Sequence, residues 1–209
     1  QFTSPINVAI PSGNFGNAYS AWFGRSNGLP VNKILCSTNV NDVLRRFIET
    51  GELAPEKTLP SVAPSMDIQI PSSLERLIFD FTDGASVFYD TLLKEHKAKL
   101  SDENIIKLNH IFSSSTFLDD DIKSEIKSLY EEFGSIFDPH SVTSIRMALD
   151  NQDSVPTVAV ATASPEKFSN IIAPLIKTSS EVVIDEKEEY LKLENDKFVI
   201  SESIKAYFS

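Results

Sequence analysis

The 209 residues (23.2 kDa) allow one large domain or two small ones, and a hydrophobic fraction of 41% is enough to bury a substantial core. The formal net charge of −11 argues against general binding to nucleic acid or to an anionic membrane, because both favour a basic face. The single cysteine, Cys36, excludes an internal disulfide framework, predicts a reducing cytoplasmic location and, with only three histidines, leaves too few ligands for a structural zinc site.

The N-terminal residues predict alternating strands and helices. Residues 6–10 form an apolar, strand-like run, and the turn-rich segment 11–16 separates it from a helix over 18–27. Gly28 lies where the glycine that ends a helix is expected. A second short strand is predicted at 33–36. The strand–helix–strand order favours an α/β fold with a mostly parallel sheet flanked by helices.

A helix, a long loop and a second helix are expected next. Asn39 is predicted to cap a helix over 40–48, where apolar residues recur at helical spacing. Residues 52–71 are rich in proline and irregular, and loops of this length are often functional. Ser72 and Glu75 have the spacing of a capping box, which predicts the start of the next helix.

The middle of the chain is predicted to be almost purely helical. Residues 85–134 are interpreted as a helical insertion, with the acidic run 119–121 at one helix start and Gly134 at its end. The predicted organisation is therefore an α/β core with the glycine loop at 1–84, the insertion at 85–134, and a return to the core with a C-terminal tail at 135–209.

The last part of the chain returns to α/β patterning. A short helix is predicted over 141–148, and residues 155–163 form the strongest strand, a continuous apolar run like a buried parallel strand. Ser164 is expected to cap the helix that follows, with a proline in its first turn. A further strand is predicted at 197–200.

The segment 12–17, between a predicted strand and a predicted helix, is the best candidate site. Its glycines let the backbone approach a ligand closely, and its N–H groups lie beside the positive end of the helix dipole. A phosphate group fits such a loop. A tight turn without a ligand explains the spacing equally well, because the segment matches neither a P-loop nor a dinucleotide fingerprint.

Thr162 is the second candidate, because ligands of open α/β sheets lie outside the carboxyl ends of strands. The polar segments around Asn39 and Asp67 are better explained by helix capping and turns. His140 follows an Asp-Pro pair and is interpreted as a turn residue. Cys36 has apolar neighbours, which predicts a buried and inert thiol.

Five segments, in chain order, resemble motifs of the threonine synthases, which are pyridoxal-phosphate enzymes of fold type II. The glycine loop at 10–17 is similar to P-[ST]-G-N-F-G-[DN]. The remaining similarities are to T-N-x-N-D-x-L-x-R-F at 38–47, S-M-D-I-Q at 65–69 with [SN]-F-E-R-L at 73–77, D-P-H-[ST] at 138–141, and [AS]-T-A-H-P-x-K-F at 161–168. Five ordered motifs are far more specific than one glycine loop.

The resemblance implies a fold like the large domain of tryptophan synthase β and the cofactor pyridoxal 5'-phosphate. It implies conversion of O-phospho-L-homoserine and water to L-threonine and phosphate. It also implies that the loop holds the cofactor phosphate, that Thr162 meets the pyridine nitrogen, and that a substrate-side rim is formed nearby. The residues implied for the loop are Gly13, Asn14, Phe15, Gly16 and Asn17, and those for the rim are Asn39, Asn41, Ser65 and Asp67.

The chain departs from the family in two residues and in one missing segment. Asn17 stands where the family usually has Asp, and Ser164 stands where it usually has His. The Schiff-base lysine of the family lies in an S-F-K-D segment upstream of the glycine loop, and no lysine of this chain lies in such a segment. We therefore expect a partner region upstream, and no catalytic base in this chain.

These residues leave three hypotheses. The first is the C-terminal portion of a threonine synthase, inactive when isolated from its N-terminal region. The second is a natural lysine-less relative that acts as a binding or regulatory protein. The third is a related phospho-lyase that acts on another phosphorylated amino acid.

Overall fold

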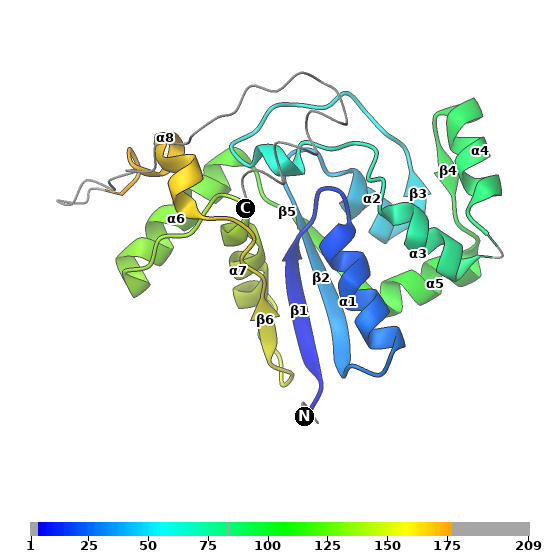
Figure 1. Ribbon diagram of the computed structural model, residues 1–209, viewed down its shortest axis with the longest axis horizontal. Coiled ribbons are helices and arrows are strands. Elements are labelled where there is room, and N and C mark those ends of the chain that lie inside the picture. The colour runs from blue at the N-terminus through cyan, green and yellow to red at the C-terminus, as the bar shows by residue number, and fades with distance from the viewer. Residues whose placement is uncertain (1–3, 83, 177–209) are drawn as a thin grey trace, which may run out of the picture. The chain divides into compact units, whose positions relative to one another are not determined.

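A four-stranded, fully parallel sheet forms the centre of the chain (Figure 1). The computed structural model describes residues 4–82 and 84–176. The strand order is β5-β2-β1-β6. The strands are β1 (Ile6–Pro11), β2 (Val31–Thr38), β5 (Phe112–Thr116) and β6 (Thr157–Ala159). The predicted α/β class with a mostly parallel sheet flanked by helices is confirmed.

The two faces of the sheet carry two separate apolar clusters, because neighbouring strand residues point to opposite faces. Ile10 and Ile34 belong to the first cluster, which contains buried residues of α1 (Gly16–Ser26), α2 (Val43–Thr50), α3 (Leu74–Phe81), α4 (Ser86–Glu95) and α5 (Asp102–Ile111). Ala9 and Leu35, one residue earlier or later, belong to the second, with α6 (Asp119–Phe133), α7 (Ser141–Asp150) and α8 (Ser169–Ile172). The two central strands, β1 and β2, are therefore apolar on both sides, as parallel strands covered by helices are.

The connections reverse direction between β1 and β6. The chain moves outward from β1 to β2 and then to β5, and afterwards returns to the opposite side of β1 as β6. Ligands of open α/β sheets bind where the winding reverses, outside the carboxyl ends of the strands. The fold thus points to the ends of β1 and β6, which are followed by the glycine loop and by Thr162.

The prediction that residues 85–134 are almost purely helical was wrong at two places. Residues 112–116 form β5, which pairs with β2 from Ile34↔Phe112 to Thr38↔Thr116. Residues 98–99 form β4, which pairs with β3 (Glu52–Leu53). The sequence of β5 is Phe-Ser-Ser-Ser-Thr, so its strand conformation comes from pairing with a distant strand rather than from an apolar pattern. The three-part division of the chain stays a prediction.

The strand predicted at 155–163 is shorter and less buried than expected. Only Thr157–Ala159 pair with β1, and Val158 is 48% exposed. Beyond the strand, serine side chains of α7 form hydrogen bonds with the backbone of the chain. Ser144 Oγ donates to the carbonyl of Val160 (2.9 Å), and Ser141 Oγ accepts from the N–H of Thr162 (2.9 Å). The N–H of Val160 still donates to Ala9 of β1 (2.9 Å), and beyond that residue the bonds to α7 replace pairing with the sheet.

Two predicted helix caps were wrong. The N-cap of α2 is Asp42, and the Asn39 side chain instead accepts from the N–H of Asn41 (2.9 Å). No capping box starts α3, because the Ser72 groups bond to the glycine loop. Ser164 is the N-cap of the short helix η2 (Pro165–Phe168), with the proline in the first turn as expected, although its side chain makes no capping bond. By contrast, Gly134 ends α6 with left-handed backbone, as expected. Gly51 ends α2 in the same way, and Ser101 caps α5.

No helix in the described ranges is long and apolar enough to cross a membrane. The strand predicted at 197–200 lies outside the described residues.

Candidate functional site

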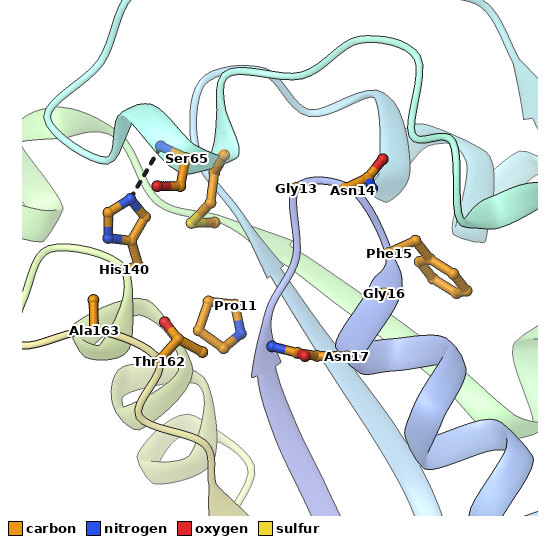
Figure 2. A pocket seen from close by; sticks show the side chains of 11 residues that line it. Pro11, Gly13, Asn14, Phe15, Gly16, Asn17, Ser65, His140, Thr162 and Ala163 are labelled. Atoms are coloured by element: carbon orange, nitrogen blue, oxygen red, sulfur yellow. Dashed lines mark hydrogen bonds between the residues drawn. The ribbon is translucent and has the colours of Figure 1, made fainter. Parts of the chain in front are cut away.

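A pocket of about 290 Å³ lies at the carboxyl ends of β1 and β6 (Figure 2). The glycine loop forms one wall, the start of α7 and the segment after β6 form the opposite wall, and the short helix η1 (Pro64–Met66) forms the rim. The lining residues are Pro11, Gly13, Asn14, Phe15, Gly16, Asn17, Ser65, Met66, His140, Thr162 and Ala163. The fold therefore brings both candidate sites of the sequence, the loop and Thr162, into one pocket.

Phe15 fixes the shape of the glycine loop. Its side chain is 1% exposed and packs against Phe112, with ring centroids 5.6 Å apart. Its backbone is left-handed (φ 69°), a conformation that bulky residues rarely adopt and that costs about 1–2 kcal/mol. Core packing thus holds a strained turn, and Figure 2 shows the ring turned away from the pocket.

This turn leaves a set of backbone donors facing the pocket. Helix α1 starts at Gly16, so the N–H groups of its first turn have no partner within the helix. Among the described residues, no protein acceptor is found for the N–H groups from Gly13 to Asn17. Successive N–H groups around a left-handed residue, at the positive end of a helix dipole, are a favourable site for an anion.

Gly13 is required by close packing on η1. A Cβ built on Gly13 would lie 2.8 Å from the carbonyl oxygen of Ser65 and 2.9 Å from the Cα of Met66. Such distances exclude any side chain unless the backbone of η1 moves. A Cβ on Gly16 would meet only the Ser73 hydroxyl, at 3.7 Å. The two glycines of the loop are therefore not equivalent.

Asn14 and Asn17 have different orientations. The Asn14 Oδ1 accepts from the N–H (2.7 Å) and the hydroxyl (2.9 Å) of Ser72, and its side chain points away from the pocket in Figure 2. The carbonyl of Asn14 also accepts from the N–H of Ser73 (3.2 Å). The Asn17 side chain points across the pocket, toward Pro11 and Thr162. Asn14 thus ties the loop to the start of α3, whereas Asn17 offers an amide to a ligand.

Of the four predicted rim residues, only Ser65 lines the pocket. The other three form a buried network that holds the loop 59–67. Asp67 Oδ1 accepts from Asn39 Nδ2 (2.7 Å), Asn41 Nδ2 (3.0 Å) and Ser61 Oγ (2.6 Å), and Asp67 Oδ2 accepts from the N–H of Ser61 (3.0 Å). Asn41 also binds Leu59 through its own amide and carbonyl groups. In this structure these three side chains shape the loop that carries Ser65.

His140 is a pocket residue that the sequence interpretation missed. It is 3% exposed, and its Nε2 accepts from the N–H of Ser65 (3.1 Å) while its Nδ1 donates to Asp138 Oδ1 (2.7 Å). Its ring also packs edge-on against Phe168. The Asp-Pro-His sequence suggested a turn, and the one signal that could have found the residue was its position in a family-like motif.

Burial alone would raise the pKa of Asp138, but hydrogen bonds from His140 and Ser141 outweigh burial and hold that pKa below its ordinary value. Asp138 is therefore ionised in the folded protein. It is fully buried, and all of its hydrogen-bond partners belong to the same turn. The carboxylate keeps His140 in a fixed orientation with the proton on Nδ1.

The donors of the pocket fit the phosphate and the ring of pyridoxal phosphate. The backbone N–H groups of the loop are uncharged and directed, which suits a phosphate at a helix N-terminus. Thr162, on the opposite wall, offers a hydroxyl that can donate or accept. No lysine is found among the described residues that line the pocket.

The known proteins that are similar in sequence to this chain include threonine synthases and threonine synthase-like proteins. The chain is 32% identical over 173 residues to the threonine synthase of Pseudomonas aeruginosa, covering 80% of this chain and 37% of that protein. It is 32% identical over 184 residues to the human threonine synthase-like 1, covering 85% of this chain and 25% of that protein. No family model matches the chain.

The solved structures that are similar to this chain include threonine synthases as well. The chain superposes on pyridoxal-phosphate-bound threonine synthase from Brucella melitensis with a TM-score of 0.82 and 25% identity, covering 97% of this chain and 46% of that one. For the yeast threonine synthase the TM-score is 0.76, with 27% identity over 82% of this chain and 38% of that one. The chain thus spans less than half of the length of each of these relatives.

The parallel sheet, and the glycine loop at the point where its winding reverses, define a fold type II enzyme domain of the pyridoxal-phosphate class. Within that class, the chain is similar to part of the threonine synthases, which are larger proteins.

Proposed function

We propose that this chain is the cofactor-binding portion of a threonine synthase, which converts O-phospho-L-homoserine and water to L-threonine and phosphate. The observation that carries the proposal is the single pocket in which the loop 13–17 faces Thr162, although the two are far apart in the chain. The family resemblance and the relatives named threonine synthase support the same reaction. A cytoplasmic location, suggested by the lone cysteine, stays a prediction.

The residues of this chain have separable roles in the proposal. The N–H groups from Gly13 to Asn17 would hold the cofactor phosphate, and the Thr162 hydroxyl would meet the pyridine nitrogen. When bound, pyridoxal phosphate supplies an electron sink for carbanions of the amino-acid substrate. A neutral hydroxyl, unlike a carboxylate, leaves the ring nitrogen without a negative partner. Asn17 and Ser65, on the wall and the rim, complete the surroundings.

The proton-transfer chemistry needs a group that is not found among the described residues that line the pocket. The family uses a lysine from an upstream segment, so the isolated chain should not turn over substrate. Here the rim residues Asn39, Asn41 and Asp67 would act indirectly, by shaping the loop that presents Ser65. The substrate-side contacts of the complete protein would combine Ser65 with groups from that region.

The test is to assay the complete protein and the 209-residue chain for phosphate and threonine release from O-phospho-L-homoserine. We expect turnover only with the complete protein. Thr162→Val, which keeps the shape and removes the hydroxyl, should lower kcat at least tenfold, and Thr162→Ser should restore most of it. A complete protein that binds pyridoxal phosphate but releases no phosphate would overturn the proposed reaction. Turnover by the chain alone would contradict the proposal that an upstream segment supplies the group that transfers protons.

A related phospho-lyase is the second candidate, because threonine synthase-like 1 proteins match the chain about as well as threonine synthases do. The same assay separates the two when it is repeated with other O-phosphorylated amino acids. Phosphate release from an analogue without threonine formation from phosphohomoserine would favour this candidate.

A further inference from the structure

Asp138 is linked through its neighbours to the rim of the pocket and to the wall that carries Thr162. Its Oδ1 accepts from the N–H (2.9 Å) and from Nδ1 (2.7 Å) of His140, and its Oδ2 accepts from the hydroxyl of Ser141. It is fully buried at the start of α7. A buried carboxylate is costly unless it is fully hydrogen-bonded, and Asp138 meets that condition. We call Asp138, His140 and Ser141 the Asp138 bridge.

One arm of the bridge reaches the rim. Because His140 Nδ1 donates to Asp138, its Nε2 has a free lone pair, which accepts the N–H of Ser65 (3.1 Å; dashed in Figure 2). Both ring nitrogens are then occupied, so His140 is not available as a base. The carbonyl of Ser65 lies against Gly13, where even a Cβ would not fit. A shift of Ser65 would therefore displace the glycine loop.

The other arm reaches the opposite wall. The hydroxyl of Ser141 donates to Asp138 and accepts the N–H of Thr162 (2.9 Å). Ser144, one turn later in α7, holds the carbonyl of Val160 (2.9 Å). These contacts take the chain off the end of β6 and bring Thr162 to the pocket. The position of the Thr162 hydroxyl thus depends on α7 and not on the sheet alone.

Helix capping by Asp138 explains only part of this arrangement. A capping carboxylate accepts N–H groups of the first turn, as Asp138 does from His140 and Ser141. Capping requires neither the bond to the imidazole nor the onward bonds to Ser65 and Thr162. The two onward bonds end on the rim and on one wall of the same pocket, which points to a role in that site.

We propose that the Asp138 bridge positions Ser65 and Thr162 and thereby sets both the affinity of the pocket for the cofactor phosphate and the surroundings of the cofactor ring. The proposal rests on the proposed function, because it takes pyridoxal phosphate as the ligand. It assigns positioning roles to Asp138, His140 and Ser141, whose side chains need not touch the reacting atoms.

Paired variants of the complete protein test the two arms. His140→Asn keeps an amide near the position of Nδ1 and loses the acceptor for Ser65, whereas His140→Gln can place an oxygen near the position of Nε2. Ser141→Ala breaks the link to Thr162, and Ser141→Thr retains the hydroxyl. Ser114→Ala is the control, because it removes a different serine hydrogen bond, from Ser114 Oγ in β5 to the carbonyl of Cys36 (2.6 Å), and Ser114 does not line the pocket.

The readouts are the Kd of pyridoxal phosphate, the ³¹P shift of its phosphate, its visible absorption band, and the Tm without cofactor. We expect His140→Asn to weaken binding about fivefold to tenfold and move the ³¹P shift, as loss of one positioning bond implies. His140→Gln should restore most of the affinity. Ser141→Ala should move the absorption band, and Ser141→Thr should return it. Ser114→Ala should change the Tm alone.

Three outcomes separate the possibilities. If His140→Asn and Ser141→Ala lower the Tm but leave the Kd within twofold and the spectra unchanged, the bridge is only structural and the proposal is wrong. If the unaltered protein does not bind pyridoxal phosphate, the proposed function fails and this inference fails with it. Finally, ¹⁵N shifts of His140 in the unaltered protein must show the neutral Nδ1–H form, since any other form cannot accept from Ser65.

Discussion

The α-carbon of Gly13 faces the carbonyl oxygen of Ser65 so closely that an added Cβ would lie 2.8 Å from that oxygen. This packing joins the glycine loop after β1 to the rim helix η1, and the two segments are about 50 residues apart in the sequence. The sequence alone suggested that Gly13 lets the backbone approach a ligand, and the structure shows in addition that a side chain there would strike the backbone of η1.

Gly13→Ala is therefore expected to cost about 1–3 kcal/mol in unfolding free energy, as for an overpacked core, and to weaken pyridoxal phosphate binding at least tenfold. Gly16→Ala is the control, because its Cβ has space and alanine favours the first helical turn. Urea unfolding should show no loss for Gly16→Ala. Equal stability of the two variants would contradict the assigned packing.

Two substitutions of Asn14 are expected to show that the stability of the loop and its affinity for an anion can change independently. Asn14→Ala removes the acceptor of two Ser72 groups and should cost about 0.5–1.5 kcal/mol. Asn14→Asp keeps the acceptor oxygen but adds a negative charge beside the pocket. It should retain stability and still weaken pyridoxal phosphate binding, because the charge opposes the phosphate. Titrations at low and high salt check the origin, since salt should reduce the effect.

Cys36 is expected to be unreactive in the folded protein. The side chain is fully buried in β2, and burial raises the pKa of the thiol to about 12, so the thiolate is scarce at neutral pH. A disulfide reagent such as DTNB at pH 8 should modify it only after urea unfolding. Rapid labelling of the native protein would show that β2 opens locally.

Asp138 is expected to make stability sensitive to acid. Because its folded pKa lies below the ordinary value, its stabilisation is present above the unfolded pKa, about 4, and is lost as the pH falls through the lower folded pKa. The difference in unfolding free energy between the unaltered protein and Asp138→Asn should therefore shrink below pH 4. Glu103→Gln is the control, since that carboxylate is exposed beside Lys107 and should contribute little at any pH.

Local patterns were sufficient for several parts of the fold. The apolar run of β1, the glycine loop and α1 are contiguous, so propensity and spacing predicted them. The residues of the loop and Thr162 were also singled out from the sequence, because each follows a predicted strand, and the structure places them in one pocket. By contrast, β5 consists of serines and a threonine behind one phenylalanine, and only its partner β2 makes it a strand.

The sequence by itself determined the α/β class, the family resemblance and the identity of the residues that face the pocket from the glycine loop, because these are written in contiguous segments. Only the tertiary structure decided that Asn39, Asn41 and Asp67 hold a loop and that His140 joins the site. The reason is physical. A polar side chain has the same donors and acceptors everywhere, and its role depends on partners that distant segments bring within hydrogen-bond distance.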